Sequence, residues 1–344
     1  MSIEFQSPQG RITVGPYQPG DEHSILELFQ LVFQVQRSLD VWNWEFRDCP
    51  QGIHSFVGRL DDGRIVSQFC GIPVKVKVHD RTLCFAQMVD SMVHPDFRSG
   101  LKKKGLFATT VDAFVDHYGR LDREVIMMGL PNPEAFRVGR KLCGYTPMTK
   151  IYTHTKELVP DPSLPPPPED VGFRMNRFQV RVVPRFAADL DELWARVVQQ
   201  HEVIAWRDAQ AMNWRYPSSP QWTYVLLEAR LAGSNRLAGV AVLRGQWLGQ
   251  PDMAIADWLV DAGIDGTAEA LLSTAEHLGR RAGMTKSRCL LNHMCEASRF
   301  FEDRDYSLTP TQFRMVSRTY ARDVVTPESL NREWYYTLGD FDVV

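Results

Sequence analysis

The chain has 344 residues, a length that suits two domains of ordinary size better than one. Hydrophobic residues make up 44% and charged residues 24%, so the chain can bury sizeable cores. The formal net charge of −3 gives no whole-protein basis for binding nucleic acid or an anionic membrane. Apolar runs are too short for a transmembrane helix. The N-terminus, MSIEFQSPQG, lacks the basic start and apolar core of a signal peptide, and we expect a cytoplasmic protein.

The six cysteines are scattered and form no C-x-x-C pair, which is typical of a reduced compartment and of small buried apolar residues. Cys289 and Cys295 flank His293, but this segment reads as a strand that runs into a helix. A zinc site needs clustered ligands, so we expect no metal site.

The hydrophobic pattern predicts strands and helices in an order typical of an α/β fold. In the first half we expect an edge strand within 1–20, a helix at 21–35, and strands at 55–60, 64–70, 72–78 and 83–93. A glycine- and lysine-rich loop follows. After it we expect a helix at 106–118, a strand at 125–130, a helix at 133–142 and a strand at 149–156.

The glycine- and lysine-rich loop is the candidate functional segment. Gly100 and Gly105 let the backbone bring its N–H groups close to a ligand. The helix that begins near Leu106 adds free N–H groups and the positive end of its dipole. With the basic side chains these groups form a candidate pyrophosphate site, the basic residues being Arg98, Lys102, Lys103 and Lys104. The alternative is a solvated basic turn between a strand and a helix.

This order of strand, Val-x-Pro-x-x-Arg, glycine loop and helix resembles the acetyl-CoA-binding motif of the GNAT N-acyltransferases. The resemblance is carried by Val93, Pro95, Arg98, Gly100, Gly105 and Phe107. The usual Arg/Gln-x-x-Gly-x-Gly/Ala pattern is matched in part by Lys102-x-x-Gly105-x-Phe107, behind a longer lead-in. The later segment MMGLPNPEAFRVGRKLCGY resembles a second motif of that family through Asn132, Ala135, Gly144 and Tyr145.

The resemblance implies an acyl-CoA-dependent N-acyltransferase that uses acetyl-CoA or another acyl-CoA as co-substrate. The acceptor would be the amine of a small molecule or a sugar. The backbone of Met92 and Val93 would polarise the thioester carbonyl. The residues expected to bind the donor are Met92, Val93, Arg98, Ser99, Gly100, Lys102, Lys103, Lys104, Gly105, Leu106, Phe107 and Asn132.

Two side chains are candidates for acid–base catalysis. Asp90 lies on the strand before the loop and is either the general base or a structural carboxylate. His94 lies next to the motif, and it either takes part in the chemistry or caps the turn. The family's acid tyrosine stands about four residues before the closing glycine, where this chain has Gly139 and Arg140. A bound water could take the missing role, or the protein could be inactive.

Four consecutive prolines at 165–168 predict a stiff spacer between folded units. We therefore expect a GNAT-like domain at 1–158, a linker at 159–172 and a second domain at 173–344. The expected fold is two tandem GNAT-like domains, each a mixed, mostly antiparallel sheet flanked by helices. The aromatic C-terminal tail, NREWYYTLGDFDVV, is expected to pack back against the protein.

The second half resembles a degenerate copy of the first. Three matches keep the same order, with Trp44 aligned to Trp214, Asp90 to Asp257, and Tyr145 to Tyr306. After Val260 the copy has no proline, arginine or lysine, and Asp261 and Asp265 place negative charge where a pyrophosphate would lie. The second domain is therefore not expected to bind CoA.

Three functions stay open on the sequence alone. The first is an active N-acyltransferase, and the second is a catalytically silent GNAT-fold protein that binds CoA or a partner. The third is an aminoacyl-tRNA-dependent transferase, against which the near-neutral net charge argues because extended nucleic-acid binding needs basic surface. We expect a monomer or a homodimer with no membrane partner.

Overall fold

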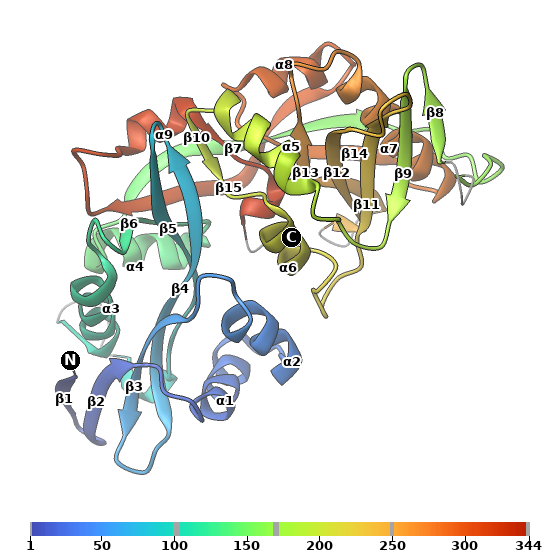
Figure 1. The fold of residues 1–344 in the computed structure, drawn as a ribbon. Coiled ribbons are helices and arrows are strands. Elements are labelled where there is room, and N and C mark those ends of the chain that lie inside the picture. Colours follow the sequence, from blue (N-terminus) through green and yellow to red (C-terminus); the bar gives the residue numbers. More distant parts are fainter. Residues whose placement is uncertain (1, 99–103, 168–171, 248–250, 342–344) are drawn as a thin grey trace. The chain divides into compact units, whose positions relative to one another are not determined.

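The computed structural model describes residues 2–98, 104–167, 172–247 and 251–341. The chain forms two compact units (Figure 1). The first unit comprises Met1–Val76, Arg81–Thr149 and Phe313–Ser329. The second comprises Lys77–Asp80, Lys150–Gln312 and Leu330–Val344.

This grouping differs from the predicted division of the chain at residue 158. Residues 150–158 belong to the second unit and residues 313–329 to the first. Two long strands are responsible, β7 (Thr146–Glu157) and β15 (Ser307–Thr319), because each begins in one unit and continues in the other. Local periodicity locates a strand but does not say which sheet it joins, since pairing depends on segments far away in sequence.

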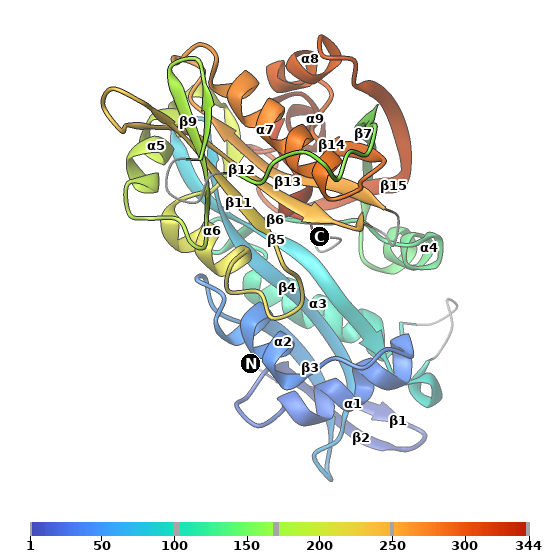
Figure 2. The same ribbon diagram turned by 90° about the vertical axis from the view of Figure 1, so that its right-hand side faces the viewer.

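The first unit is a mixed sheet with helices on both sides (Figure 2). Its strands are β1 (Ile3–Ser7), β2 (Gly10–Pro16), β3 (His54–Leu60), β4 (Ile65–Val78), β5 (Arg81–Val93) and β6 (Glu124–Gly129). They lie in chain order, and the last part of β15 pairs antiparallel with β6. Strands β5 and β6 are parallel. The helical elements are α1 (Glu22–Phe33), α2 (Leu39–Trp42), the π-helical turn η1 (Asn43–Arg47), η2 (Pro95–Phe97), α3 (Leu106–Tyr118) and α4 (Pro133–Leu142).

Several predicted elements are confirmed, including the helices at 106–118 and 133–142, which are α3 and α4. The strands predicted at 64–70 and 72–78 are instead one continuous strand, β4. Gly71 lies inside it, where a Cβ would come within 2.9 Å of the Ala86 methyl group. This glycine therefore permits close approach to β5 and is no strand terminator.

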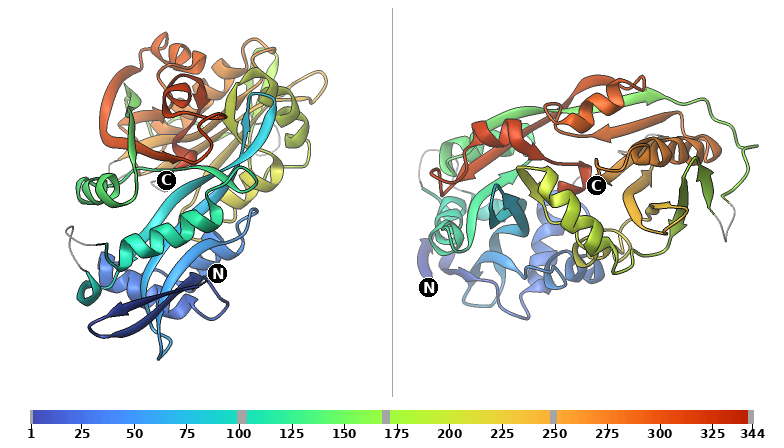
Figure 3. Two further views of the ribbon diagram at one scale, coloured as in Figure 1. Left: turned by 90° about the vertical axis from the view of Figure 1, so that its left-hand side faces the viewer. Right: turned by 45° about the horizontal axis from the view of Figure 1, so that its top comes forward.

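The core of the first unit lies between α3 and the sheet. Phe114 of α3 packs edge-on against Phe69 of β4, and both side chains are fully buried. The hydroxyls of Ser67 and Thr110 hydrogen-bond across the same layer at 2.8 Å. Figure 3 (left) shows α3 lying along the strands of this unit. The apolar face of α3 thus holds this helix, which follows the glycine- and lysine-rich loop, against the sheet.

The second unit repeats the order of the first. Its strands are β8 (Phe173–Met175), β9 (Phe178–Val183), β10 (Val203–Ala205), β11 (Val225–Leu231), β12 (Leu237–Gly245), β13 (Asp252–Val260), β14 (Lys286–Leu290) and β16 (Trp334–Tyr335). The sheet runs β8-β9-β11-β12-β13-β14-β7, with β15 next to β7. Strands β13 and β14 are its parallel pair, as β5 and β6 are in the first unit. The repeat seen in the sequence is therefore a repeat of topology.

The helical elements of the second unit complete this correspondence. They are α5 (Leu190–Val197), η3 (Val198–Gln200), α6 (Ala209–Arg215), α7 (Thr267–Arg281), α8 (Glu296–Glu302) and η5 (Leu338–Asp340), while α9 (Pro327–Glu333) spans both units. Helix α7 connects β13 to β14, as α3 connects β5 to β6. The C-terminal tail packs into this unit, where Trp334, Tyr336 and Phe341 are buried.

Candidate functional site

Strand β5 extends beyond its parallel partner β6. Their register ends with Gln87 opposite Met128, whereas β5 continues to Val93 and β6 ends at Gly129. On its other side β5 remains held, since the next amide, that of His94, donates to the Val66 carbonyl at 2.9 Å. Residues 88–93 therefore present an edge that no described part of β6 covers in register. Such an edge offers backbone N–H and C=O groups to an extended ligand.

Helix α3 begins just after this strand and the loop that follows it. Its N-cap is Gly105, which is extended at φ −97° and ψ −175°, and no described side chain caps the helix. Helix α4 is different, because Asn132 Oδ1 accepts a hydrogen bond from the Ala135 amide at 2.8 Å. An uncapped helix start leaves its first N–H groups, and the positive end of the dipole, available to an anion.

Two of the predicted basic residues are described. Arg98 Nε donates to the Val93 carbonyl at 3.1 Å, which fixes the arginine at the end of β5. Lys104 forms an exposed ion pair with Asp112 at 2.6 Å. The remaining predicted donor-binding residues of the loop, namely Ser99, Gly100, Lys102 and Lys103, lie outside the described residues.

Asp90 is engaged in a buried ion pair. Its Oδ1 accepts from Arg37 Nη2 at 3.1 Å, its Oδ2 accepts from Nη1, and Nη1 also lies 3.2 Å from Glu45. The Arg37 and Asp90 side chains are only 16% and 7% exposed. Burial raises the pKa of Asp90, and the guanidinium of Arg37 opposes that rise. Asp90 also has a φ of 47°, in the left-handed region that non-glycine residues seldom adopt.

The second unit contains the same pair. Arg207 Nε donates to Asp257 Oδ1 at 2.9 Å, and both side chains are buried. Arg207 follows Arg37 by 170 positions, the spacing that also separates Trp214 from Trp44. The sequence prediction named neither arginine, although their constant spacing was a signal that could have found them. Because the pair recurs in the copy without a basic loop, it supports the structural interpretation of Asp90.

The other predicted side chains have local contacts. His94 Nδ1 accepts from the Asp96 amide at 3.3 Å and so caps η2. The Met92 and Val93 side chains are buried in the core, which leaves only their backbone for a ligand. Asn132 serves as the cap of α4.

Part of the first unit matches a known protein family. A family model described as an acetyltransferase (GNAT) domain matches residues 13–131, from β2 to just beyond the end of β6. These residues are a GNAT domain. No curated protein matches the sequence.

Solved structures extend the shared fold over both units. A probable N-acyltransferase from Enterococcus faecalis V583 is similar at a TM-score of 0.62 and 12% identity, over 90% of this chain and 72% of that one. A GCN5-related N-acetyltransferase from Anabaena variabilis gives 0.60 and 12%, over 90% and 73%. The Saccharomyces cerevisiae N-myristoyltransferase with bound myristoyl-CoA gives 0.56 and 12%, over 92% and 79%. Likeness at such low identity establishes the fold only.

The structure explains why position 139 of the first unit is a glycine. A Cβ at this glycine would lie 2.0 Å from Cδ2 of the Tyr145 ring, so the ring occupies the space of a side chain. A second tyrosine, Tyr320, enters the domain from β15 and the segment after it, and its amide donates to the Val125 carbonyl at 2.8 Å. Burial raises the pKa of both phenols, so both stay protonated at neutral pH. Sequence proximity to the motif did not point to Tyr320.

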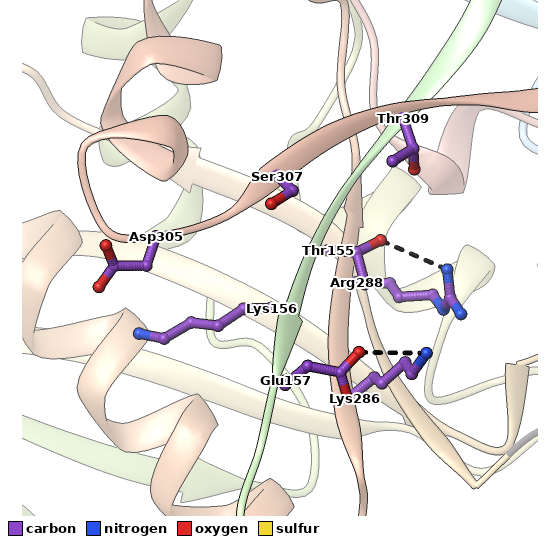
Figure 4. Close-up of a pocket in the computed structure, with 8 residues that line it drawn as sticks. All are labelled: Thr155, Lys156, Glu157, Lys286, Arg288, Asp305, Ser307 and Thr309. Carbon is purple, nitrogen blue, oxygen red and sulfur yellow. Dashed lines mark hydrogen bonds and ion pairs between the residues drawn. The ribbon is translucent and has the colours of Figure 1, made fainter.

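A charged cavity of about 540 Å³ lies within the second unit (Figure 4). It is lined by Thr155, Lys156, Glu157, Lys286, Arg288, Asp305, Ser307 and Thr309. Each of its cations already has a carboxylate: Lys156 Nζ lies 3.0 Å from Glu276, Lys286 Nζ 3.2 Å from Glu157, and Arg288 Nε 2.6 Å from Asp252. The cavity therefore lacks spare positive charge for a pyrophosphate.

The described ranges were also considered for metal ligands and for membrane-spanning helices. They contain no group of three or more His, Cys, Asp or Glu side chains that could hold a metal ion. None of the helices in the same ranges has the length and apolar character needed to cross a membrane.

Proposed function

We propose that this protein is an acyl-CoA-dependent N-acyltransferase whose GNAT domain binds the donor. The observation that carries the proposal is the extension of β5 beyond β6, immediately before a loop that leads to the uncapped start of α3. The extended arm of the acyl-CoA, which contains amide groups, would pair with the strand edge at 88–93. Its pyrophosphate would accept hydrogen bonds from the first turn of α3, with Arg98 and Lys104 adding positive charge.

The chemistry of the proposed reaction is acyl transfer from a thioester to an amine. The backbone N–H groups of Met92 and Val93 would polarise the thioester carbonyl. The amine nitrogen attacks that carbon, the new C–N bond forms, the C–S bond breaks, and the thiolate takes up a proton. Because both carboxylate oxygens of Asp90 are engaged by Arg37, the proposal assigns removal of the amine proton to bound water.

The acyl chain and the acceptor belong to the same proposal. One structure that shares the fold holds myristoyl-CoA, so donors from acetyl to myristoyl are all candidates. The proposed acceptor is the amine of a small molecule or of a sugar. The second unit is proposed not to bind the donor, because its own tail packs against the strand that corresponds to β5, with the Tyr335 hydroxyl donating to the Trp258 carbonyl.

Calorimetric binding of acetyl-CoA and myristoyl-CoA to the full chain tests the proposal. The decisive variant is Gly105→Asp, which places a carboxylate at the N-cap of α3. Aspartate is a favourable N-cap residue, so the fold should be retained, with the free energy of unfolding within about 0.5 kcal/mol of wild type. Its charge would occupy the first-turn N–H groups and repel a pyrophosphate.

We expect donor binding to the Gly105→Asp variant to fall at least tenfold. Gly105→Ser is the matched control, since a serine caps the helix without adding charge and should weaken binding less. Undiminished CoA binding by Gly105→Asp would show that the pyrophosphate does not lie at this helix.

A catalytically silent CoA-binding protein is the second candidate, favoured by the packing of Tyr145 over Gly139. Under this alternative the donor would bind, and the Gly105→Asp variant would lose it. Under the same alternative, the wild-type protein would release no free CoA from the acyl-CoA in the presence of any amine. Measurement of thiol release with a panel of amines distinguishes the two candidates.

A further inference from the structure

Arg244 is a buried guanidinium with no carboxylate partner among the described residues. It lies near the end of β12, and the residue is only 6% exposed. Its Nε is buried and has no hydrogen-bond partner. Among the described residues, no carboxylate lies within 4.0 Å of this side chain.

Other arginines buried in the second unit are all paired. Arg207 bonds to Asp257 and Asp340, and Arg230 bonds to Asp189 and Glu228. Removing a charged group from water without a partner is strongly unfavourable. Arg244 is thus an exception to the pattern of its own unit. Burial lowers its pKa, and the nearby phenol of Tyr224 opposes that effect only in part.

An aromatic side chain lies against this guanidinium. The Trp222 ring centroid lies 3.5 Å from the Arg244 Cζ atom, in a cation–π contact, and Trp222 is itself 39% exposed. Tyr224 is close enough that both Arg244 and Arg215 lower the pKa of its phenol, against the larger effect of burial. Arg215 donates to the Phe341 carbonyl and, like Arg244, forms no ion pair with a described carboxylate. Two positive charges therefore act on Tyr224, and one of them, Arg244, lies against the partly exposed indole of Trp222.

We propose that Arg244, under the indole of Trp222, binds the oxyanion of a small molecule, either a carboxylate or a phosphate. The stacked indole covers one face of the guanidinium and leaves its edge, where the N–H donors lie, for a planar or tetrahedral anion. A charge-assisted hydrogen bond to a bound anion would compensate for the burial of Arg244. This site lies in the unit that is proposed not to bind CoA, so it is separate from the donor site.

Thermal unfolding of the full chain tests the proposal, with inorganic phosphate and acetate as separate probes. Chloride at matched ionic strength is the reference. We expect at least one probe to raise the Tm of the wild type in a saturable manner, by about 2 °C or more. In the Arg244→Met variant we expect no such rise, and in chloride a Tm equal to or above that of wild type, because an unpaired buried charge has been removed.

Two matched variants serve as controls. Arg288→Met removes an arginine that is paired with Asp252, and it should lower the Tm while keeping the response to the anion. Gly105→Asp blocks the proposed donor site and should also keep the response. A response retained by Arg244→Met, or abolished by Gly105→Asp, would overturn the proposal, since the anion would then bind elsewhere.

The remaining outcomes also decide the proposal. A response to acetate alone identifies a carboxylate ligand, a response to phosphate alone identifies a phosphate ligand, and no response to either overturns the site. If Arg244→Met fails to fold, Trp222→Ala replaces it, because that side chain is partly exposed. A full anion response in Trp222→Ala would then overturn the proposal.

Discussion

Arg37 and Asp90 form a two-point ion pair inside the GNAT domain, although they are separated by 53 positions in the sequence. The Asp90 carboxylate in this pair is buried, and the Asp90 backbone has a φ of 47°. Both features are unfavourable without a compensating partner. The recurrence of the pair as Arg207 and Asp257 argues that its role is to fix the strand before the loop.

The Asp90→Asn variant tests this role. Asparagine tolerates the left-handed region as aspartate does, so the substitution isolates the charge. We expect the free energy of unfolding to fall by about 3–5 kcal/mol, because Arg37 loses its main counter-ion. Turnover per folded molecule should stay within a few-fold of wild type in an assay at a temperature where the variant is folded.

Asp257→Asn is the matched control, since it breaks the same pair in the other unit. A similar loss of stability in both variants is expected if the two carboxylates share a structural role. Normal stability of Asp90→Asn together with abolished turnover would instead identify Asp90 as the general base.

The contact between Gly139 and Tyr145 predicts a packing defect. Gly139→Ala would bring a methyl group to within 2.0 Å of the tyrosine ring. Alanine normally favours a helix over glycine, but here overpacking should dominate and lower the free energy of unfolding by about 1–3 kcal/mol. Urea unfolding measures the change.

Two further variants isolate the clash. Gly233 has no neighbouring atom within 4 Å of its added Cβ, so Gly233→Ala should leave the urea midpoint nearly unchanged. In a protein that already carries Tyr145→Ala, the Gly139→Ala substitution should lower the free energy of unfolding less than it does in the wild type. Equal effects of Gly139→Ala in the presence and absence of the ring would refute a direct clash.

The tail of the second unit is part of its core. Phe341 is fully buried and packs edge-on against Tyr336, with ring centroids 5.5 Å apart. Phe341→Ala should lower the free energy of unfolding by about 3–5 kcal/mol. Urea unfolding followed by tryptophan fluorescence checks this, and an unchanged midpoint would show that the tail is dispensable.

His201 predicts a pH dependence of stability. Burial, with the positive charges of Arg207 and Lys77, lowers its pKa from 6.5 to about 4. In the unfolded chain the imidazole takes up a proton below about pH 6.5, whereas in the folded protein it does so only near pH 4. The unfolded state therefore binds more protons in this window, and stability falls as the pH decreases from 6.5 to 4.

The contribution of His201 over that window is on the order of 3 kcal/mol. Urea unfolding at a series of pH values should show a shallower acid dependence in His201→Phe than in the wild type. Parallel dependences in the two proteins would show that the histidine is not shifted.

Local elements around the loop were predictable because their signals are local. The apolar spacing of α3 and the Asn132-Pro133 start of α4 each lie within a dozen residues, and both helices appear at their predicted bounds. The motif around Val93 and Gly105 depends on the same kind of short-range pattern. The prediction of two strands around Gly71 was wrong because a glycine can mark close packing as well as a turn.

The sequence by itself determined the order of strands and helices, the position of the glycine- and lysine-rich loop, and the repetition of one half by the other. Only the tertiary structure decided that β15 completes the sheet of the first unit and that Arg37 meets Asp90. It also decided that Arg244 meets no carboxylate in the part of the chain that the structure describes. Hydrophobic periodicity and turn residues act over a few positions, so they can be read along the chain. Strand partners and counter-ions are chosen across tens to hundreds of positions, where the packing of the whole unit selects among many chemically equivalent residues.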